Sequence, residues 1–125
     1  MRRLIIAMTL WAATGGAWAA SGEQQFNQYC SACHQRTGMG VPRAFPALKG
    51  DKVTLGPAGP LAAVVLNGRG GMPAFKAQLS DEDLAAILTY VRGAWGNKAQ
   101  AIAAADVARA RGGPAAPAAT RLLAH

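Results

Sequence analysis

The chain has only two cysteines among its 125 residues, and both lie in one short segment, at positions 30 and 33. A disulfide-stabilised scaffold needs several cysteines spread along the chain, so the sequence excludes that class. Acidic residues are also scarce, six against thirteen basic ones, and the formal net charge is +7. Nucleic-acid binding is the general interpretation of such a balance, but these basic residues are scattered singly and no binding motif accompanies them. We therefore expect no nucleic-acid partner and a positive surface that favours acidic protein partners.

A long apolar run is also missing. Residues 4–13 are apolar, but a membrane span takes about 20 such residues, and polar and glycine residues follow at once. Arg2 and Arg3 precede the run, and residues 17–19 have the small-x-small pattern of a cleavage site. These three parts are typical of a secretory signal, with an uncleaved anchor as the alternative. We predict that residues 1–19 are a cleaved signal peptide, that the mature protein is periplasmic, and that it has no membrane span.

The two cysteines belong to the segment Cys30-Ser31-Ala32-Cys33-His34, a C-x-x-C-H pattern typical of covalent attachment of a c-type haem. Side chains three residues apart on a helical turn point the same way, so both sulfurs can reach vinyl groups along one porphyrin edge. His34 follows directly, and imidazole is a usual axial ligand of haem iron. The motif predicts one haem c, bound covalently through Cys30 and Cys33, with His34 as an iron ligand.

Three other interpretations of these cysteines are weaker. A thioredoxin-like dithiol should follow a strand in a βαβ pattern, and no such strand is predicted before Cys30. A zinc site needs about four ligands, and the only other histidine is His125, the last residue. A disulfide between Cys30 and Cys33 would close a loop too short to add much stability.

Met72 is the candidate for the second axial position. It follows the glycine-rich residues 67–71 and precedes Pro73, in a segment with neither a helix nor a strand pattern. Glycines let the backbone turn sharply and approach a flat ligand closely. A buried core methionine is the ordinary explanation of a single Met, but Met72 has little packing reason to lie here, and Met39 is too near His34 in sequence to reach the opposite haem face. A thioether favours ferrous iron, so His/Met ligation raises the reduction potential.

Helical patterns dominate the rest of the chain. Ser21 and Gln24 form a capping box before a helix that continues into the motif. A short apolar helix is predicted over residues 60–67, and the best-specified helix covers 79–95, with Ser80 as N-cap and acidic residues in its first turn. We expect an all-α fold with three to four helices around the haem.

The remaining segments lack regular patterns. Residues 43–50 are predicted to form a loop with buried apolar residues. The haem domain should cover residues 20–97, and residues 98–125 should form an Ala-rich C-terminal extension, partly helical and partly disordered.

From residue 21 to residue 97 these motifs resemble the class I cytochromes c, small monohaem electron carriers of the bacterial respiratory chain. The resemblance implies that Phe26 and Tyr90 are the aromatic residues through which the first and last helices cross. It also implies that the Pro46 carbonyl accepts the N–H of the histidine ligand and that Leu48 packs on the haem. The cofactor-binding set is then Cys30, Cys33, His34, Met72, Pro46 and Leu48.

The resemblance implies an electron carrier rather than an enzyme, because both axial positions are taken by protein ligands. We expect transient redox partners with acidic docking surfaces, among them a dehydrogenase or a terminal oxidase or reductase. A positive rim beside the haem edge would guide them, formed by Arg36, Arg43, Arg69 and Lys76.

Two alternatives stay open. The segments 95–97 and 105–107 look like parts of cytochrome domains associated with periplasmic dehydrogenases, which would make the protein a subunit of such a complex. In the less favoured alternative Met72 is not bound, and a five-coordinate haem serves as a peroxidase or a gas-binding site.

Overall fold

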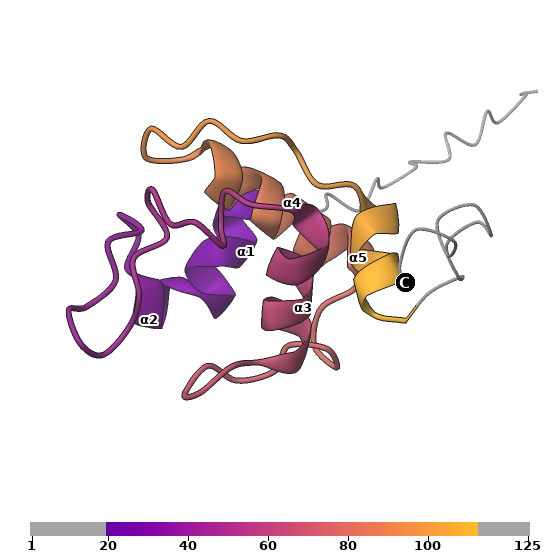
Figure 1. The fold of residues 1–125 in the computed structure, drawn as a ribbon, viewed down its shortest axis with the longest axis horizontal. Coiled ribbons are helices and arrows are strands. Elements are labelled where there is room, and N and C mark those ends of the chain that lie inside the picture. The colour runs from indigo at the N-terminus through magenta and orange to yellow at the C-terminus, as the bar shows by residue number, and fades with distance from the viewer. Residues whose placement is uncertain (1–19, 113–125) are drawn as a thin grey trace, which may run out of the picture.

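The computed structural model describes residues 20–112, and within this range the regular structure is helical (Figure 1). Two isolated bridges, one at Val41–Phe45 and one at Arg69–Met72, are the β pairings of the described residues. The all-α prediction is confirmed. The predicted signal peptide and the tail beyond residue 112 lie outside the described residues. The helices are α1 (Gly22–Tyr29), α2 (Ser31–His34), α3 (Ala58–Asn67), α4 (Asp81–Gly93) and α5 (Ala104–Ala110).

The first helix begins as predicted and ends earlier. Ser21 Oγ accepts the N–H of Gln24 at 3.2 Å, and the Gln24 side chain accepts the N–H of Ser21 at 2.9 Å, which completes the capping box. The expected continuous helix is broken at Cys30, whose φ of −121° leaves the helical range, and the chain resumes as the one-turn α2. This break is one reason why the described residues contain five helices instead of three to four.

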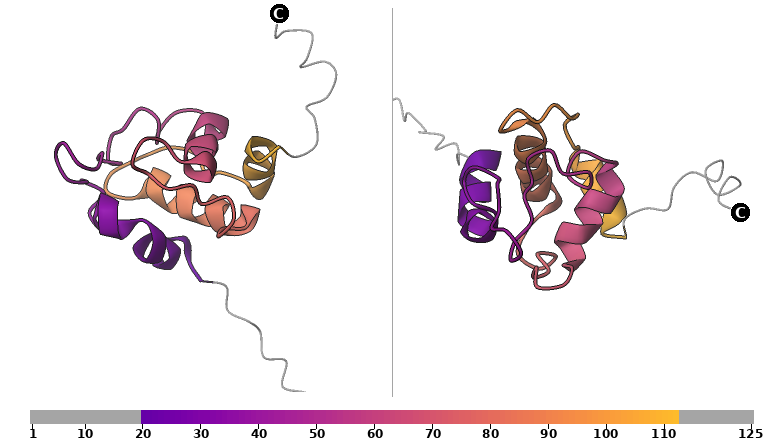
Figure 2. Two further views of the ribbon diagram at one scale, coloured as in Figure 1. Left: turned by 90° about the horizontal axis from the view of Figure 1, so that it is seen from below. Right: turned by 60° about the vertical axis from the view of Figure 1, so that its left-hand side comes forward.

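The second well-predicted helix is α4. Ser80 Oγ accepts the N–H of Asp83 at 3.1 Å and thus caps the first turn. The helix ends at Gly93, two residues before the predicted end at Trp95. Its apolar stripe is buried, and α4 lies in the middle of the molecule with α1 on one side and α5 on the other (Figure 2).

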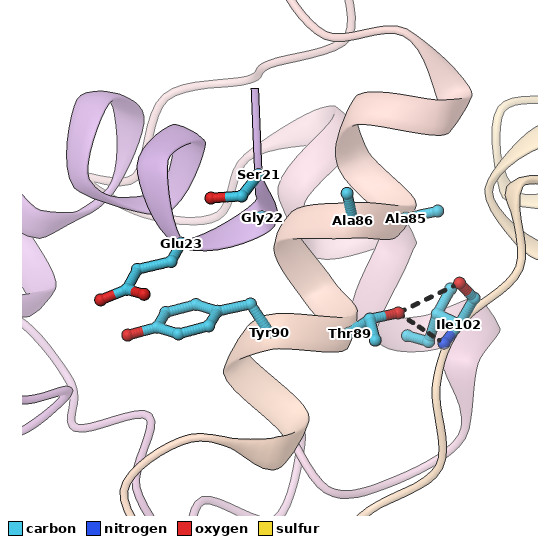
Figure 3. A pocket seen from close by; sticks show the side chains of 8 residues that line it. All are labelled: Ser21, Gly22, Glu23, Ala85, Ala86, Thr89, Tyr90 and Ile102. Carbon is cyan, nitrogen blue, oxygen red and sulfur yellow. Dashed lines mark hydrogen bonds between the residues drawn. The ribbon is translucent and has the colours of Figure 1, made fainter. Parts of the chain in front are cut away.

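The crossing of α1 and α4 is very close. The Phe26 and Tyr90 rings pack with centroids 5.5 Å apart, at the place where the two helices cross. A Cβ on Gly22 would overlap the carbonyl oxygen of Ala86, so only glycine lets α1 approach α4 this closely. The same crossing forms a shallow surface hollow with Glu23 beside Tyr90 (Figure 3). Burial and the Glu23 carboxylate raise the pKa of the Tyr90 phenol.

The core continues past residue 97, which the sequence analysis takes as the end of the haem domain. Ile102 and Val107 are buried, and α5 packs against α3 and α4. Thr89 Oγ1 pairs with both the N–H and the carbonyl of Ile102, at 3.0 and 3.2 Å. The Arg111 guanidinium then donates to Asp81 at 2.7 Å. Residues 98–112 are therefore an integral part of the domain.

No helix among residues 20–112 combines the length and the apolar character that crossing a membrane requires.

The close approach of α1 and α4 predicts the effect of Gly22→Ala. The added methyl group would force α1 away from Ala86, and such overpacking lowers the free energy of unfolding by about 1–3 kcal/mol. Urea unfolding of the haem-containing protein, followed by circular dichroism, measures this loss. Gly93→Ala is the control, because Gly93 also lies in a helix but has open space around its Cβ position, so alanine should add about 0.5–1 kcal/mol. Equal effects of the two substitutions would contradict a tight crossing.

Candidate haem site

All six residues predicted to bind the cofactor line one cavity of about 260 Å³. α1 and α2, the loop that follows them, α3, the methionine segment and α4 form its walls. Most of the lining is apolar, as expected of a site for a large flat hydrophobic group. The structure thus brings together two thiols, one imidazole and one thioether that lie up to 42 positions apart in the sequence.

His34 is fixed by one hydrogen bond. Its Nδ1 lies 2.9 Å from the carbonyl oxygen of Pro46, and the side chain is 8% exposed. A carbonyl can only accept, so Nδ1 carries the proton and Nε2 of the neutral ring keeps its lone pair. This tautomer is the one in which Nε2 can bind a metal, and the bond to Pro46 sets the orientation of the ring.

Pro46 lies in a loop that the residues just after α4 hold in place. Asn97 is 6% exposed and makes three hydrogen bonds: its Oδ1 accepts the N–H of Gly50 at 2.9 Å, and its Nδ2 donates to Leu48 at 3.2 Å and to Val91 at 2.9 Å. Trp95, two residues earlier in the chain, supplies a second anchor. The sequence analysis did not identify Asn97, and its position in the Trp-Gly-Asn ending was the only signal.

Trp95 is the second anchor of this loop. Its Nε1 donates to the carbonyl of Arg36 at 2.8 Å, and its ring lies so close to Gly38 that a Cβ there would overlap the indole. Gly38 in turn accepts the N–H of Leu48 at 2.7 Å. The indole therefore supports the start of the loop, while Asn97 supports its end.

Cys30 lies at the break between α1 and α2, and Cys33 lies within α2. Both are reduced and half-buried, and both line the cavity. Burial, and to a smaller degree the neighbouring Cys33, raises the pKa of the Cys30 thiol to about 11. Among the described residues before Cys30, from 20 to 29, the regular structure is α1, so this part of the chain holds no strand of the kind a thioredoxin-like site requires.

Met72 sits at the end of a tight two-residue turn. Its backbone exchanges two hydrogen bonds with Arg69, at 3.0 and 3.2 Å, across Gly70 and Gly71. Gly68, at φ +73°, allows the Met72 carbonyl to approach, since a Cβ there would lie 2.5 Å from that oxygen. The methionine side chain is partly buried against the core and lines the cavity.

A buried arginine holds a further part of the cavity wall. Arg92, 6% exposed, donates from Nη1 to the carbonyls of Thr54 at 2.9 Å and Gly56 at 2.6 Å, and from Nε to Gln100 at 2.6 Å. Thr54 lines the cavity, so Arg92 joins its wall to α4 and to the segment that leads into α5. The sequence analysis missed this residue as well.

The donor set fits a covalently bound haem. Two thiols with c-type spacing, an imidazole with a free Nε2 and a thioether share one apolar cavity, which matches the ligand chemistry of haem c.

Known proteins that are similar in sequence also indicate a haem-binding chain. Residues 17–91 match the family model described as cytochrome c oxidase, cbb3-type, subunit III. The chain is 38% identical over 76 residues to cytochrome c6 of Leptolyngbya boryana, which covers 58% of this chain and 88% of that protein. It is 33% identical over 112 residues to cytochrome c-552 of Thermus thermophilus, which covers 78% of this chain and 74% of that protein.

A solved structure supports the fold. Cytochrome c6 from the diatom Phaeodactylum tricornutum matches with a TM-score of 0.51 and 34% identity, over 59% of this chain and 90% of that one. The chain therefore belongs to the cytochrome c family and groups with the monohaem class I members. Membership of this family implies a covalently bound haem c.

Larger proteins also match. The chain is 31% identical over 113 residues to the cytochrome c subunit of alcohol dehydrogenase (quinone) from Gluconacetobacter polyoxogenes, which covers 79% of this chain. It spans only 24% of that subunit, about a quarter of its length.

The three bonds of Asn97 predict a large effect of Asn97→Ala. The substitution leaves the buried Val91 carbonyl, the partly buried Leu48 carbonyl and the Gly50 N–H without their partner, which should lower the free energy of unfolding by about 2–4 kcal/mol. Chemical unfolding of the haem-containing protein measures it. Asn67→Ala is the control, because Asn67 is exposed and makes one bond, so a change within about 0.5 kcal/mol is expected. An Asn97 variant as stable as the Asn67 variant would show that the loop does not depend on this anchor.

Proposed function

We propose that the protein is a periplasmic electron carrier with a single haem c, in which Cys30 and Cys33 hold the porphyrin and His34 and Met72 bind the iron. The observation that supports this most is the shared cavity, because it presents imidazole and thioether together with both attachment thiols. Leu48 would pack against the porphyrin from the loop that also carries Pro46.

The bound haem would supply a one-electron couple at its iron. The chain's own residues then have two tasks. His34, oriented by Pro46, and Met72, presented by its glycine turn, would occupy both axial positions, so that no site is left for a substrate. The largely apolar wall would limit the water near the iron, and a soft sulfur ligand favours the reduced state. Both features suit electron transfer more than catalysis.

The basic residues of the predicted rim fit transient, electrostatically guided encounters. Arg36, Arg43, Arg69 and Lys76 are all exposed, and Arg69 also lines the cavity. We propose that they steer acidic redox partners, such as a dehydrogenase or a terminal oxidase or reductase, toward this part of the surface. Export through residues 1–19 would place the protein with such partners outside the cytoplasm.

A second candidate function is that of an electron-transfer subunit in a dehydrogenase complex. The similarity to the cytochrome c subunit of a quinone-dependent alcohol dehydrogenase favours it. Co-purification with a dehydrogenase at high salt would support this function over that of a free carrier.

The proposal is tested first by the pigment. Protein expressed with its leader and purified from the periplasm should be coloured, and the colour should stay with the protein in acidified acetone, since thioether bonds do not dissociate. A colourless protein or an extractable pigment would refute covalent attachment.

Met72→Ala tests the sixth ligand. Loss of the thioether should remove the weak long-wavelength absorption band of the ferric protein that sulfur coordination produces, and it should lower the reduction potential. Absorption spectra and redox titration measure both. Met39→Ala is the control, because Met39 is 55% exposed and does not line the cavity, so band and potential should not change. A band that survives in the Met72 variant would exclude this residue as ligand.

The positive rim predicts opposite salt effects for small reagents of opposite charge. Oxidation of the reduced protein by anionic hexacyanoferrate should slow severalfold as ionic strength rises, because screening removes the attraction. Oxidation by a cationic cobalt complex should accelerate under the same conditions. Stopped-flow kinetics measure both rates, and equal salt dependence for the two reagents would contradict electrostatic steering.

A further inference from the structure

The segment that follows Met72 forms part of the cavity wall. Residues 73–80, the 73–80 segment, connect Met72 to α4 and contain no helix. Phe75 and Leu79 of this segment line the cavity, and Leu79 is only 4% exposed. A displacement of the segment would therefore change both the wall of the site and the position of Met72.

The N–H groups of the 73–80 segment fix one of its sides to α3. Phe75 donates to the Val65 carbonyl at 3.0 Å, and Lys76 donates to the Leu66 carbonyl at 3.2 Å. Both acceptors lie in the last turn of α3, where carbonyls have no partner inside the helix. These two bonds therefore complete the end of α3 and attach the segment to it.

Arg111, the residue that follows α5, holds the carbonyl groups of the same segment. Its Nη1 donates to the Lys76 carbonyl at 2.6 Å, and its Nη2 donates to the Leu79 carbonyl at 2.7 Å. Its Nε donates to the carboxylate of Asp81, the first residue of α4, at 2.7 Å. A guanidinium presents its donors in a rigid planar fork, so one side chain can keep three acceptors in a fixed arrangement. Arg111 thus fastens the end of the 73–80 segment to the start of α4.

Arg111 is itself held in a fixed position. α5 packs against α3 and α4 (Figure 2), and Val107, one turn before Arg111, is fully buried. The N–H of Arg111 donates to the Val107 carbonyl at 2.9 Å. The Arg111 side chain is 24% exposed and does not line the cavity. It therefore acts on the cavity wall from outside the site.

We propose that Arg111 is a positioning residue for the axial methionine, which it keeps in place by holding the carbonyls of Lys76 and Leu79. This inference rests on the proposed function, in particular on Met72 as the sixth ligand, and adds the residue that opposes loss of that ligand. Hydrogen bonds from a charged donor are stronger than neutral ones, so removal of the guanidinium weakens the attachment of the 73–80 segment. The segment then opens more often while the helices stay folded.

This role matters most in the oxidised protein. A soft thioether favours ferrous iron, so its bond to ferric iron is the weaker of the two, and Met72 leaves more easily in the ferric state. A carrier that lost Met72 on oxidation would have to rebind it before or after each reduction, which would slow electron transfer. Firm attachment of the 73–80 segment keeps the same ligand on the iron in both states.

Imidazole binding to the ferric protein tests the proposal, because added imidazole can replace Met72 only after the thioether has left the iron. The observed binding rate should rise with imidazole concentration to a limit, which is the rate at which the 73–80 segment opens. Arg111→Gln should raise this limiting rate about tenfold, the effect of one lost hydrogen bond to a charged group. Arg111→Lys keeps the charge without the planar fork and should raise the rate by a smaller factor, about threefold. Stopped-flow absorption measures these rates.

Two controls separate positioning from general effects of charge and stability. Arg109→Gln removes the same charge from α5, but Arg109 pairs with Asp106 of its own helix, so the limiting rate should not change. Gly22→Ala lowers the stability of the domain at the crossing of α1 and α4, away from the 73–80 segment, so its limiting rate should also stay that of the wild type. An increase in either control as large as that in Arg111→Gln would overturn the proposal.

The variants of Arg111 can also fail outright. A wild-type limiting rate in Arg111→Gln shows that the guanidinium does not hold the ligand in place. If this variant yields no folded protein, Arg111→Lys decides, and a wild-type rate in it has the same meaning. A wild-type ferric protein without the long-wavelength band, whose imidazole rate rises linearly with no limit, would instead refute Met72 as ligand. Failure of the proposed ligation is thus seen in the wild type, and failure of the positioning role only in the variants.

Discussion

The hydrogen bond from His34 to the Pro46 carbonyl is the interaction on which the site depends. It selects the tautomer whose Nε2 can bind iron and sets the direction in which the ring points. The acceptor lies twelve positions away in a loop without regular structure, so this geometry is only as firm as the loop. Trp95 and Asn97, which follow α4, hold both ends of the loop through their hydrogen bonds. The C-terminal part of the domain thus controls the orientation of a ligand near its beginning.

Local features of the sequence predicted the parts of the structure that local chemistry determines. The capping box at Ser21 and the N-cap at Ser80 depend on side chains three residues apart, and both are present. The C-x-x-C-H motif and the glycine turn before Met72 likewise contain within a few residues the information that places their side chains. Family resemblance added the role of Pro46, and the predicted bond is present. These elements account for the cavity and its donor set.

The features that the sequence did not reveal depend on residues distant in the chain. Asn97 contacts positions up to 49 residues away, and Arg92 reaches Thr54 across 38. The residues next to Asn97 and Arg92 in the sequence do not indicate which distant groups they bond. A single arginine is ordinarily a solvated charge. From the sequence alone, Gly22 is only a residue of low helix propensity. Its contact with Ala86 of α4 shows why the position requires glycine. The break at Cys30 is also a result of tertiary packing, which overrides local periodicity.

Arg92 also couples parts of the molecule that would otherwise open separately. Its guanidinium joins the cavity wall at residues 54–56, the middle of the domain and the chain that leads into α5. Detaching one of these segments removes one or two of the three acceptors of a cation that the other segments keep buried, and this costs more than the loss of an exposed hydrogen bond. The three segments should therefore behave as one cooperative unit, with their amide hydrogens exchanging with solvent in a single event. A redox protein gains from this, because a wall that does not fluctuate locally keeps the surroundings of the iron constant between its two charge states.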